Sequence, residues 1–294
     1  MTRRLLVLGC GYVGAEVCRR AGDAGWSAIG IVRSEASRAR LAGEGLDVRA
    51  LDVLTGDLSS LGSGWEGVLI ALSAGARGEA AYREVYAEGP ARIAAWADSA
   101  GVRSLVLLSS TGVYRQDGVV DEDASAGGDA SSDALVAGER AVLESRVSSR
   151  TVLRLGGLYG PGRHYLLDQL RRGERTLGGP SGHRINYLHR DDAATACLAA
   201  LSAPAGVHLY NVTDGHPVTK AALAHWICER LGQTAPVFNP AAPAGPRARL
   251  AGGPPPDRAV QSDRIRRELG WKPRFPRVFD GLADLLPPAL GSHS

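Results

Sequence analysis

LLVLGCGYVGAEVCRR, residues Leu5–Arg20, joins a short apolar run to a glycine-rich turn and then to a helical pattern. The spacing G-x-G-x-x-G is informative when a strand precedes it and a helix follows it, as here. Gly9 suits the tight turn, Gly11 the close approach of a pyrophosphate, and Gly14 the packing of the helix on a sheet. N–H groups at the helix start would then face the phosphates. The stretch predicts a dinucleotide-binding loop. Its expected cofactor contacts are Gly9, Gly11, Tyr12, Val13 and Gly14.

The first ten residues, MTRRLLVLGC, also mimic a lipoprotein signal with a basic start, an apolar run and a cysteine. The apolar run Leu5–Leu8 is too short for the hydrophobic region of a signal peptide. No other stretch reaches the length needed to cross a membrane. Cys10, Cys18, Cys197 and Cys228 lack metal-ligand spacing, so reduced thiols are expected. We therefore expect a cytoplasmic protein with no membrane partner and no metal site.

The overall composition is that of an ordinary globular protein. With 294 residues, of which 44% are apolar, the chain is long enough to bury a full core. The net charge is only +3, and no basic tract is interleaved with aromatic residues. Nucleic-acid binding is therefore not indicated, and a small-molecule substrate is expected.

Apolar runs of strand length alternate with helical patterns through the first half of the chain. The predicted strands are Arg4–Leu8, Ser27–Val32, Asp47–Leu51, Gly67–Leu72, Ser104–Ser109 and Thr151–Leu155. The predicted helices are Val13–Ala24, Glu35–Ala42, Glu79–Ala100 and Asp133–Arg146. The strand patterns are continuously apolar, so both faces of the sheet must be covered. This order predicts an α/β fold with a doubly wound parallel sheet of the Rossmann type.

The pattern changes after Leu155, where glycine-rich loops and short helices follow. We predict a dinucleotide-binding domain over residues 1–156 and a smaller substrate-binding lobe over residues 157–294. Residues from about 187 to 212 are expected to return to the Rossmann core. The segment Ala235–Ala259 is rich in Pro and Gly and is predicted to lack regular structure. So long a loop is either disordered or a lid over a site.

A basic residue, Arg33, follows the second predicted strand. An acidic side chain at this point would bind the adenosine ribose of NAD, whereas a planar guanidinium suits the 2′-phosphate of NADP. The alternative is that Arg33 is a solvated surface side chain. NADP is thus the first expected cofactor and NAD the second. Asp52, after the third strand, is expected to bind the adenine amino group.

Four further stretches extend the pattern. They are LVLLSSTGVY (105–114), LRLGGLYGPG (153–162), RINYLHRDDAA (184–194) and LGWKPRFP (269–276). With the glycine loop, they resemble the extended short-chain dehydrogenase/reductase superfamily and its NAD(P)-dependent epimerase/dehydratase family. The resemblance implies that Ser110 is a catalytic hydroxyl that binds a substrate oxygen, and that two long helices can form a homodimer. It also implies cofactor contacts at Ala71, Leu72 and Ser73 and substrate contacts at Arg163, His164 and His189.

The resemblance further implies a tyrosine followed four residues later by a lysine, whose charge lowers the pKa of the phenol for proton transfer. The pair should lie in SSDALVAGERAVLE (131–144), which contains neither residue. Lys220 and Lys272 are the only lysines, and neither has a tyrosine four residues before it. The chain therefore resembles the atypical branch of the superfamily. Tyr114 is the best substitute acid or base; alternatively, it is a tyrosine packed on the end of the sheet.

Two functions stay open. The first is an NADP-dependent oxidoreductase or epimerase-like enzyme for a small oxygenated substrate, with Ser110 and Tyr114 (or water) handling the proton. The second is an NAD(P)-binding module without redox turnover, either a sensor or a non-redox enzyme. The missing pair favours the second function, and the retained Ser110 and substrate lobe favour the first. If the substrate is anionic, Arg163, Arg184 and Arg258 could hold it.

Overall fold

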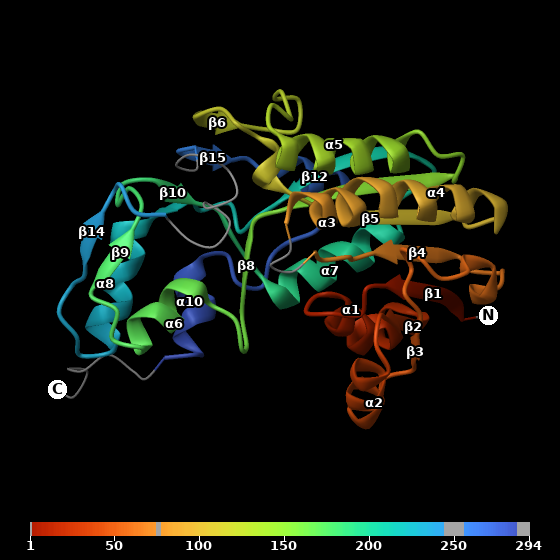
Figure 1. The fold of residues 1–294 in the computed structure, drawn as a ribbon, viewed down its shortest axis with the longest axis horizontal. Coiled ribbons are helices and arrows are strands. Elements are labelled where there is room, and N and C mark those ends of the chain that lie inside the picture. The colour runs from red at the N-terminus through yellow and green to blue at the C-terminus, as the bar shows by residue number, and fades with distance from the viewer. Residues whose placement is uncertain (1, 75–77, 244–255, 287–294) are drawn as a thin grey trace.

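A computed structural model describes residues 2–74, 78–243 and 256–286. Its centre is a seven-stranded sheet in the order β12-β7-β5-β4-β1-β2-β3, with every neighbouring pair parallel (Figure 1). The strands are β1 (Arg3–Leu8), β2 (Trp26–Val32), β3 (Val48–Ala50), β4 (Gly67–Ile70), β5 (Ser104–Ser110), β7 (Ser149–Leu155) and β12 (Gly206–Val212). The predicted doubly wound parallel sheet is confirmed.

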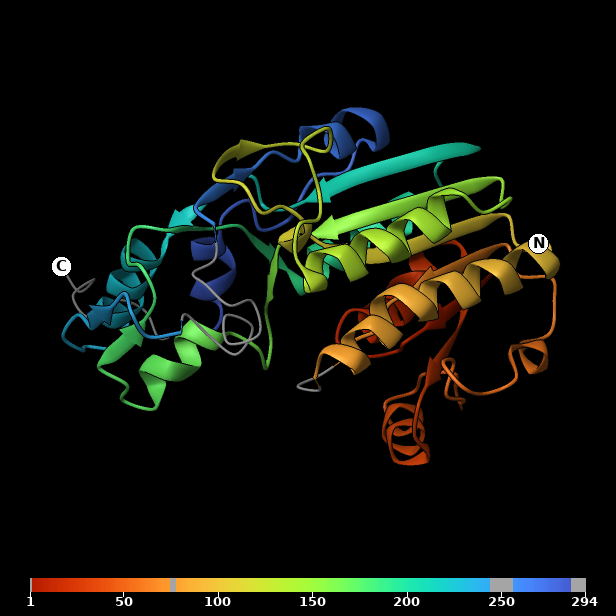
Figure 2. The same cartoon turned by 45° about the horizontal axis from the view of Figure 1, so that its top comes forward.

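Both faces of the sheet are buried, which explains the continuous apolar runs. Along β1, Leu5 and Val7 belong to one core cluster, and Leu6 and Leu8 belong to another. Successive side chains of a strand point to opposite faces, so a strand covered on both sides must be apolar throughout. The helices on the first face are α1 (Gly14–Ala21) and α7 (Arg190–Leu201), and those on the second are α4 (Gly89–Ser99) and α5 (Ala130–Leu143) (Figure 2).

The predicted helix over residues 79–100 is divided into three parts. They are α3 (Glu79–Arg83), a π-helical turn η3 (Glu84–Glu88) and α4. The turn ends just before Pro90, whose ring has no N–H for the helical hydrogen-bond ladder. The other flanking helices are α2 (Glu35–Gly43) and α9 (Asp263–Leu269).

The remaining elements gather beyond the carboxyl ends of the sheet strands, toward which the strand arrows point in Figure 2. They share a core of their own. The helices are α6 (Tyr165–Arg171), α8 (Lys220–Arg230) and α10 (Val278–Ala283), and the short strands are β8 (Gly157–Tyr159), β9 (Thr176–Gly178), β10 (Arg184–Ile185), β11 (Tyr187–His189), β13 (Val218–Thr219) and β14 (Val237–Asn239). Since β12 is a strand of the sheet and α7 packs on it, we propose that the substrate lobe covers residues 157–294 and that residues from about 187 to 212 return to the sheet domain.

The prediction that Ala235–Ala259 lacks regular structure was wrong at both ends of the segment. β14 pairs with β9, and β15 (Arg258–Val260) pairs with β6 (Gly118–Val120). The prolines flank β14 rather than interrupt it, so they remove no ladder hydrogen bond there. The lid prediction for the middle of the segment falls on residues 244–255, outside the described residues.

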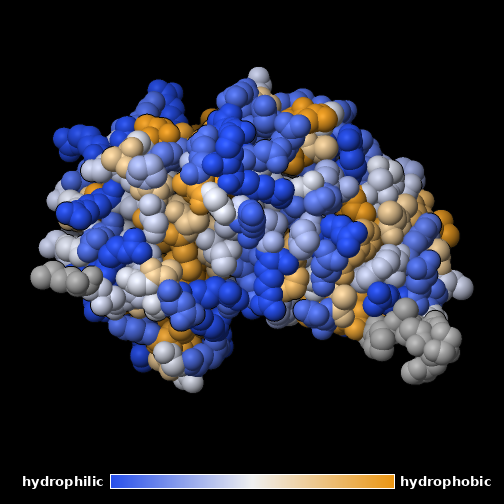
Figure 3. Space-filling model, turned by 180° about the vertical axis from the view of Figure 1, so that it is seen from behind, coloured by the Kyte–Doolittle hydropathy of each residue, from blue (hydrophilic) through white to orange (hydrophobic). Residues whose placement is uncertain are grey.

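The surface seen from behind is mostly polar, and apolar side chains form small separate patches on it (Figure 3). Scattered apolar side chains of this kind are normal on a globular protein. Across the described ranges, no helix is both long enough and apolar enough to cross a membrane.

Candidate functional site

The residues predicted to hold a cofactor meet at one edge of the sheet. The loop Gly9–Gly14 follows β1, Arg33 follows β2, Asp52 follows β3, and Ala71–Ser73 follow β4. These strands are parallel, so their carboxyl ends lie along the same edge. The strand order reverses between β1 and β4, which is where ligands bind in open α/β sheets.

The glycine loop leaves a concave backbone surface at this edge. Gly9 has φ +98°, and a Cβ there would lie 2.5 Å from the Ala71 carbonyl oxygen. A Cβ on Gly14 would overlap the Gly9 carbonyl oxygen, whereas a Cβ on Gly11 would meet nothing within 4 Å. Among the described residues no side chain caps the N-terminus of α1, and apart from the Ala15 N–H, which donates to the Gly11 carbonyl oxygen, its first N–H groups are left for a ligand. The loop therefore fits a dinucleotide pyrophosphate.

Tyr12 and Val13 differ in what they can offer a cofactor. Val13 is buried in the core, so its contact would be through the backbone. The Tyr12 ring lies 5.3 Å from the Arg163 guanidinium and 5.5 Å from that of Arg190. Its hydroxyl is buried without a hydrogen-bond partner among the described residues. Burial also raises the pKa of Tyr12, so its phenol is neutral and can donate.

Arg33 differs from the two arginines behind it. Arg38 forms an ion pair with Glu35, and Arg40 forms one with Glu44. Arg33 is exposed and, within the described ranges, makes no hydrogen bond or ion pair. It is thus available to an external anion at the end of β2.

The remaining predicted cofactor residues follow β3, in the case of Asp52, and β4, in the case of Ala71–Ser73. The Asp52 carboxylate accepts a hydrogen bond from the Leu54 N–H at 3.0 Å, which fixes its orientation. Ala71 and Leu72 are partly buried and Ser73 is exposed. All four residues thus border the same open edge as the glycine loop.

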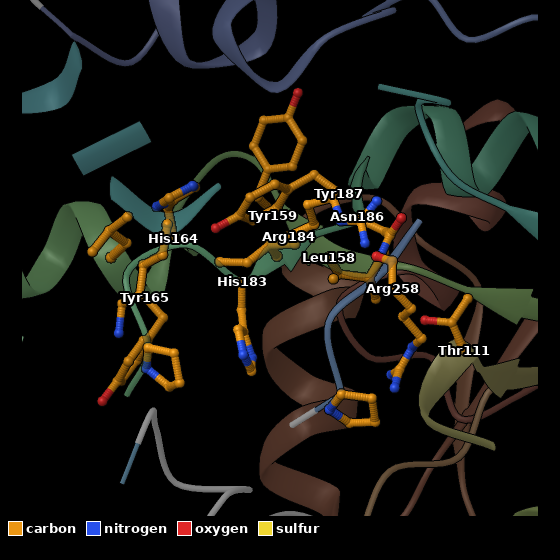
Figure 4. A pocket seen from close by; sticks show the side chains of 16 residues that line it. Thr111, Leu158, Tyr159, His164, Tyr165, His183, Arg184, Asn186, Tyr187 and Arg258 are labelled. Carbon is orange, nitrogen blue, oxygen red and sulfur yellow. The ribbon is translucent and has the colours of Figure 1, made fainter. Parts of the chain in front are cut away.

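A cavity of about 350 Å³ lies next to this edge, between the sheet and the lobe (Figure 4). In Figure 4, Arg258 and Thr111 lie at one end and His164 and Tyr165 at the other. Thr111 directly follows the last residue of β5, so this end adjoins the sheet edge. Leu158, Leu166, Pro180, Ile185, Tyr187 and Pro256 give much of the wall an apolar character.

A sequence model of the NAD dependent epimerase/dehydratase family matches residues 5–213 of this chain. The chain belongs to this family. A relative from Streptomyces sp, named 3-diazoavenalumate denitrifying reductase, is 36% identical over 213 residues, covering 66% of this chain and 69% of the relative.

Solved structures support the same fold for this epimerase/dehydratase family member. A functionally unknown conserved protein from Silicibacter pomeroyi has a TM-score of 0.81 at 25% identity, covering 97% of this chain and 98% of that chain. The UDP-glucuronic acid 4-epimerase from Bacillus cereus, in complex with UDP-glucuronic acid and NAD, has a TM-score of 0.79 at 17% identity, covering 95% and 96%.

The two predicted catalytic side chains, Ser110 and Tyr114, have different surroundings. Ser110 ends β5, and its Oγ accepts the Gly112 N–H at 3.1 Å. Tyr114 is fully buried; its hydroxyl donates to Asn211 Oδ1 at 2.8 Å and accepts from Arg154 Nη1 at 2.9 Å. Burial raises the pKa of Tyr114. In this structure the Tyr114 hydroxyl is turned into the interior, as in the alternative of a tyrosine packed at the end of the sheet, and its role as an acid or base stays a prediction.

Tyr114 belongs to a buried polar network that joins β5, β7 and α5. Arg154 on β7 binds Glu139 on α5, with Nη2 and Oε2 at 2.7 Å, and both side chains are buried. Glu139 also accepts a hydrogen bond from Ser109. The helix α5 covers most of the stretch where the resemblance predicts a tyrosine and a lysine, and it contains neither. The network therefore ties α5 to the sheet without supplying an exposed phenol.

The three cationic side chains that line the cavity, Arg184, Lys220 and Arg258, have different kinds of partner. Arg184 binds both carboxylate oxygens of Asp257, at 2.9 and 3.0 Å. The Lys220 ammonium donates to the Gly178 carbonyl oxygen. Arg258 has no ion pair in the described chain. No acidic side chain is among the described residues that line the cavity, and the Asp257 carboxylate is held by Arg184.

His164 presents one fixed donor at the far end of the cavity. Its Nδ1 accepts the Leu167 N–H at 3.0 Å, so the ring proton is on Nε2. Nε2 is buried and has no partner in the described structure. Burial lowers the pKa of His164 to about 4, so the ring is neutral at physiological pH. A ligand acceptor would complete this hydrogen bond.

The other two predicted substrate contacts lie outside the cavity lining. Arg163 sits beside the Tyr12 ring, and His189 caps α7 by accepting the Asp191 N–H at 3.2 Å. The His189 ring also packs on Phe275, with the ring centroids 4.1 Å apart. Both substrate contacts stay predictions, and in this structure the two side chains have other partners outside the cavity.

Thr111, His183, Asn186, Tyr187 and Lys220 also line the cavity, although the motifs did not single them out. One signal was available: Lys220 is one of only two lysines in an arginine-rich chain. Thr111, Asn186 and Tyr187 lie within the stretches 105–114 and 184–194 quoted above, but short strands and loops bring these residues together only in the folded protein.

Proposed function

We propose that the protein is an NADP-dependent reductase that transfers a hydride to a small substrate held in the cavity. The observation that carries the proposal is the position of Ser110 and Thr111. Ser110 ends β5 at the edge where the glycine loop lies, and Thr111 lines the cavity. A dinucleotide on the glycine loop would therefore extend to the mouth of the cavity.

The choice of a reductase over an epimerase rests on α5, which holds no tyrosine and no lysine. Epimerisation through a ketone begins with removal of a hydroxyl proton as hydride leaves, and this needs a base at that oxygen. Reduction of an electron-poor centre needs no such base, because the hydride arrives on carbon and water can supply the proton. The Streptomyces relative, named a reductase, supports this choice.

When NADPH is bound, it supplies the hydride for the reaction. The glycine loop, Ser110 and the cavity wall then bind the cofactor, bind the substrate and exclude water. The glycine loop and the uncapped start of α1 would hold the pyrophosphate. Ser110 Oγ already accepts the Gly112 N–H, so its own proton is available to bind a substrate oxygen or nitrogen. The apolar cavity wall would exclude water from the reacting carbon.

Replacement of Arg33 by alanine is expected to weaken NADPH binding and leave NADH binding unchanged. A charge-assisted hydrogen bond to phosphate contributes about 1.5–3 kcal/mol, so the expected loss is about 10- to 100-fold. Titration of the cofactor fluorescence measures both affinities. Arg38→Ala is the matched control, because Arg38 is already paired with Glu35. An unchanged NADPH affinity in Arg33→Ala would show that this arginine does not bind the phosphate.

Turnover is tested by following NADPH oxidation with aldehydes, ketones and aryl diazo compounds. One NADPH is expected to be consumed per molecule of reduced product, and Ser110→Ala should lower kcat by about 100-fold. Ser99→Ala, at the end of α4 away from the sheet edge, is the control and should have no effect. Tight NADPH binding without any turnover would instead favour the second function, an NAD(P)-binding module, which the composition of α5 also supports.

A further inference from the structure

Arg258 is a partly buried cation that has no ion pair within the described chain. We infer that the cavity takes an organic acid with a flat apolar body, whose carboxylate pairs with the Arg258 guanidinium. The inference rests on the proposed function only in assigning the cavity to the substrate. It adds the chemical class of that substrate and the residue that selects it.

The surroundings of Arg258 leave part of its guanidinium unsatisfied. Nη1 donates to the Tyr114 carbonyl oxygen at 2.8 Å, while Nε is buried without a partner. The neighbouring carboxylate, Asp257, is occupied by Arg184. Burial lowers the pKa of Arg258 to about 10, with Arg115 contributing in the same direction, so the group is still charged at neutral pH. A partly desolvated charge without a counter-ion is less stable than in water, and a bound anion would offset part of that loss.

The backbone that carries Arg258 is held firmly in place. The Asn186 side chain donates to the Arg258 carbonyl oxygen at 3.0 Å and accepts the Val260 N–H at 2.8 Å. β15 also pairs with β6 over three residues. The guanidinium is therefore positioned before a ligand arrives, which lowers the entropy lost on binding.

The rest of the cavity suits a flat apolar body rather than a sugar diphosphate. Leu158, Ile185 and Tyr187 form its wall, and His164 Nε2 offers one neutral donor at the end opposite Arg258 (Figure 4). A sugar diphosphate carries at least two charges and many hydroxyl groups, which need polar partners along its whole length. A carboxylate at Arg258 and an acceptor near His164 match the donors at the two ends.

The test compares acids with amides of the same shape in the full chain saturated with NADP⁺. The probes for calorimetry are trans-cinnamate with trans-cinnamamide, and 2-naphthoate with 2-naphthamide. The wild-type protein is expected to bind each acid about 30-fold more tightly than its amide. Arg258→Gln should reduce this ratio to about 3 or less without weakening amide binding, and Arg258→Lys should keep part of it. Arg163→Gln, outside the cavity, is the matched control and should leave the ratio unchanged.

Several outcomes would overturn the inference. They are an acid-to-amide ratio near one in the wild-type protein, an unchanged ratio in Arg258→Gln, binding of none of the probes, or tighter binding of UDP-glucose than of the acids. If thermal unfolding shows that Arg258→Gln is not folded, the wild-type and Arg258→Lys ratios decide. Since binding to the NADP⁺ form involves no turnover, a failed reductase assay and a failed acid preference are separate results.

Discussion

An alanine at position 9 is expected to abolish dinucleotide binding and to destabilise the folded chain. Gly9 has φ +98°, a conformation that costs a residue with a Cβ about 1–3 kcal/mol. The added Cβ would also lie 2.5 Å from the Ala71 carbonyl oxygen, so β4 or the loop must move. Either movement would displace the N–H groups that we propose hold the pyrophosphate. Thermal unfolding and NADPH titration measure the two effects.

Gly11→Ala is the matched control, because it introduces the same methyl group two residues along. Nothing lies within 4 Å of a Cβ there, so stability should stay within about 0.5 kcal/mol of the wild type. The methyl group would occupy the space that the pyrophosphate needs, so NADPH affinity should still fall by at least about 10-fold. A stable Gly9→Ala protein, or normal NADPH binding by Gly11→Ala, would contradict this account of the loop.

Arg154→Met is expected to lower the free energy of unfolding by about 3–5 kcal/mol, because it leaves the Glu139 carboxylate buried without its ion-pair partner. It also removes the donor to the Tyr114 hydroxyl. Arg154→Met combined with Glu139→Leu should recover part of the loss, since no unpaired charge remains. Urea unfolding followed by circular dichroism measures all three proteins.

Arg140→Met tests whether burial causes this effect. Arg140 pairs with Glu144 on the same helix, but both side chains are exposed. Exposed pairs four residues apart contribute only about 0.3–0.5 kcal/mol. Similar losses in Arg140→Met and Arg154→Met would refute the buried-network explanation.

The sheet could be predicted because its signal is local. Runs such as Leu5–Leu8 or Leu105–Leu108 are apolar at every position, and a strand covered on both faces requires this. The glycine loop was equally readable, since its spacing and its place between strand and helix follow one another in sequence. Arg33 could be placed at the cofactor edge for the same reason, as it directly follows a strand.

The cavity could not be read in this way. Tyr114 follows Ser110 closely, yet the fold turns its hydroxyl toward Arg154 and Asn211 in the interior. Nothing in the sequence gave a reason to prefer Arg163 or Arg258 as the arginine that binds an anionic substrate. In the structure, the backbone of Arg258 is fixed through β15 and Asn186, whereas Arg163 lies beside Tyr12. These differences depend on partners far away in the chain.

The sequence by itself determined the parallel sheet, the dinucleotide loop and the absence of a tyrosine and lysine from the helix at residues 131–144. Backbone geometry and hydrophobic periodicity act over a few residues, so they can be read in order along the chain. Only the tertiary structure decided which arginine Asp257 pairs with: it binds Arg184 from a distant part of the chain, and its neighbour Arg258 has no carboxylate partner in the described ranges. Charge pairing depends on distances in space and on burial, and adjacent residues in the sequence can differ completely in both.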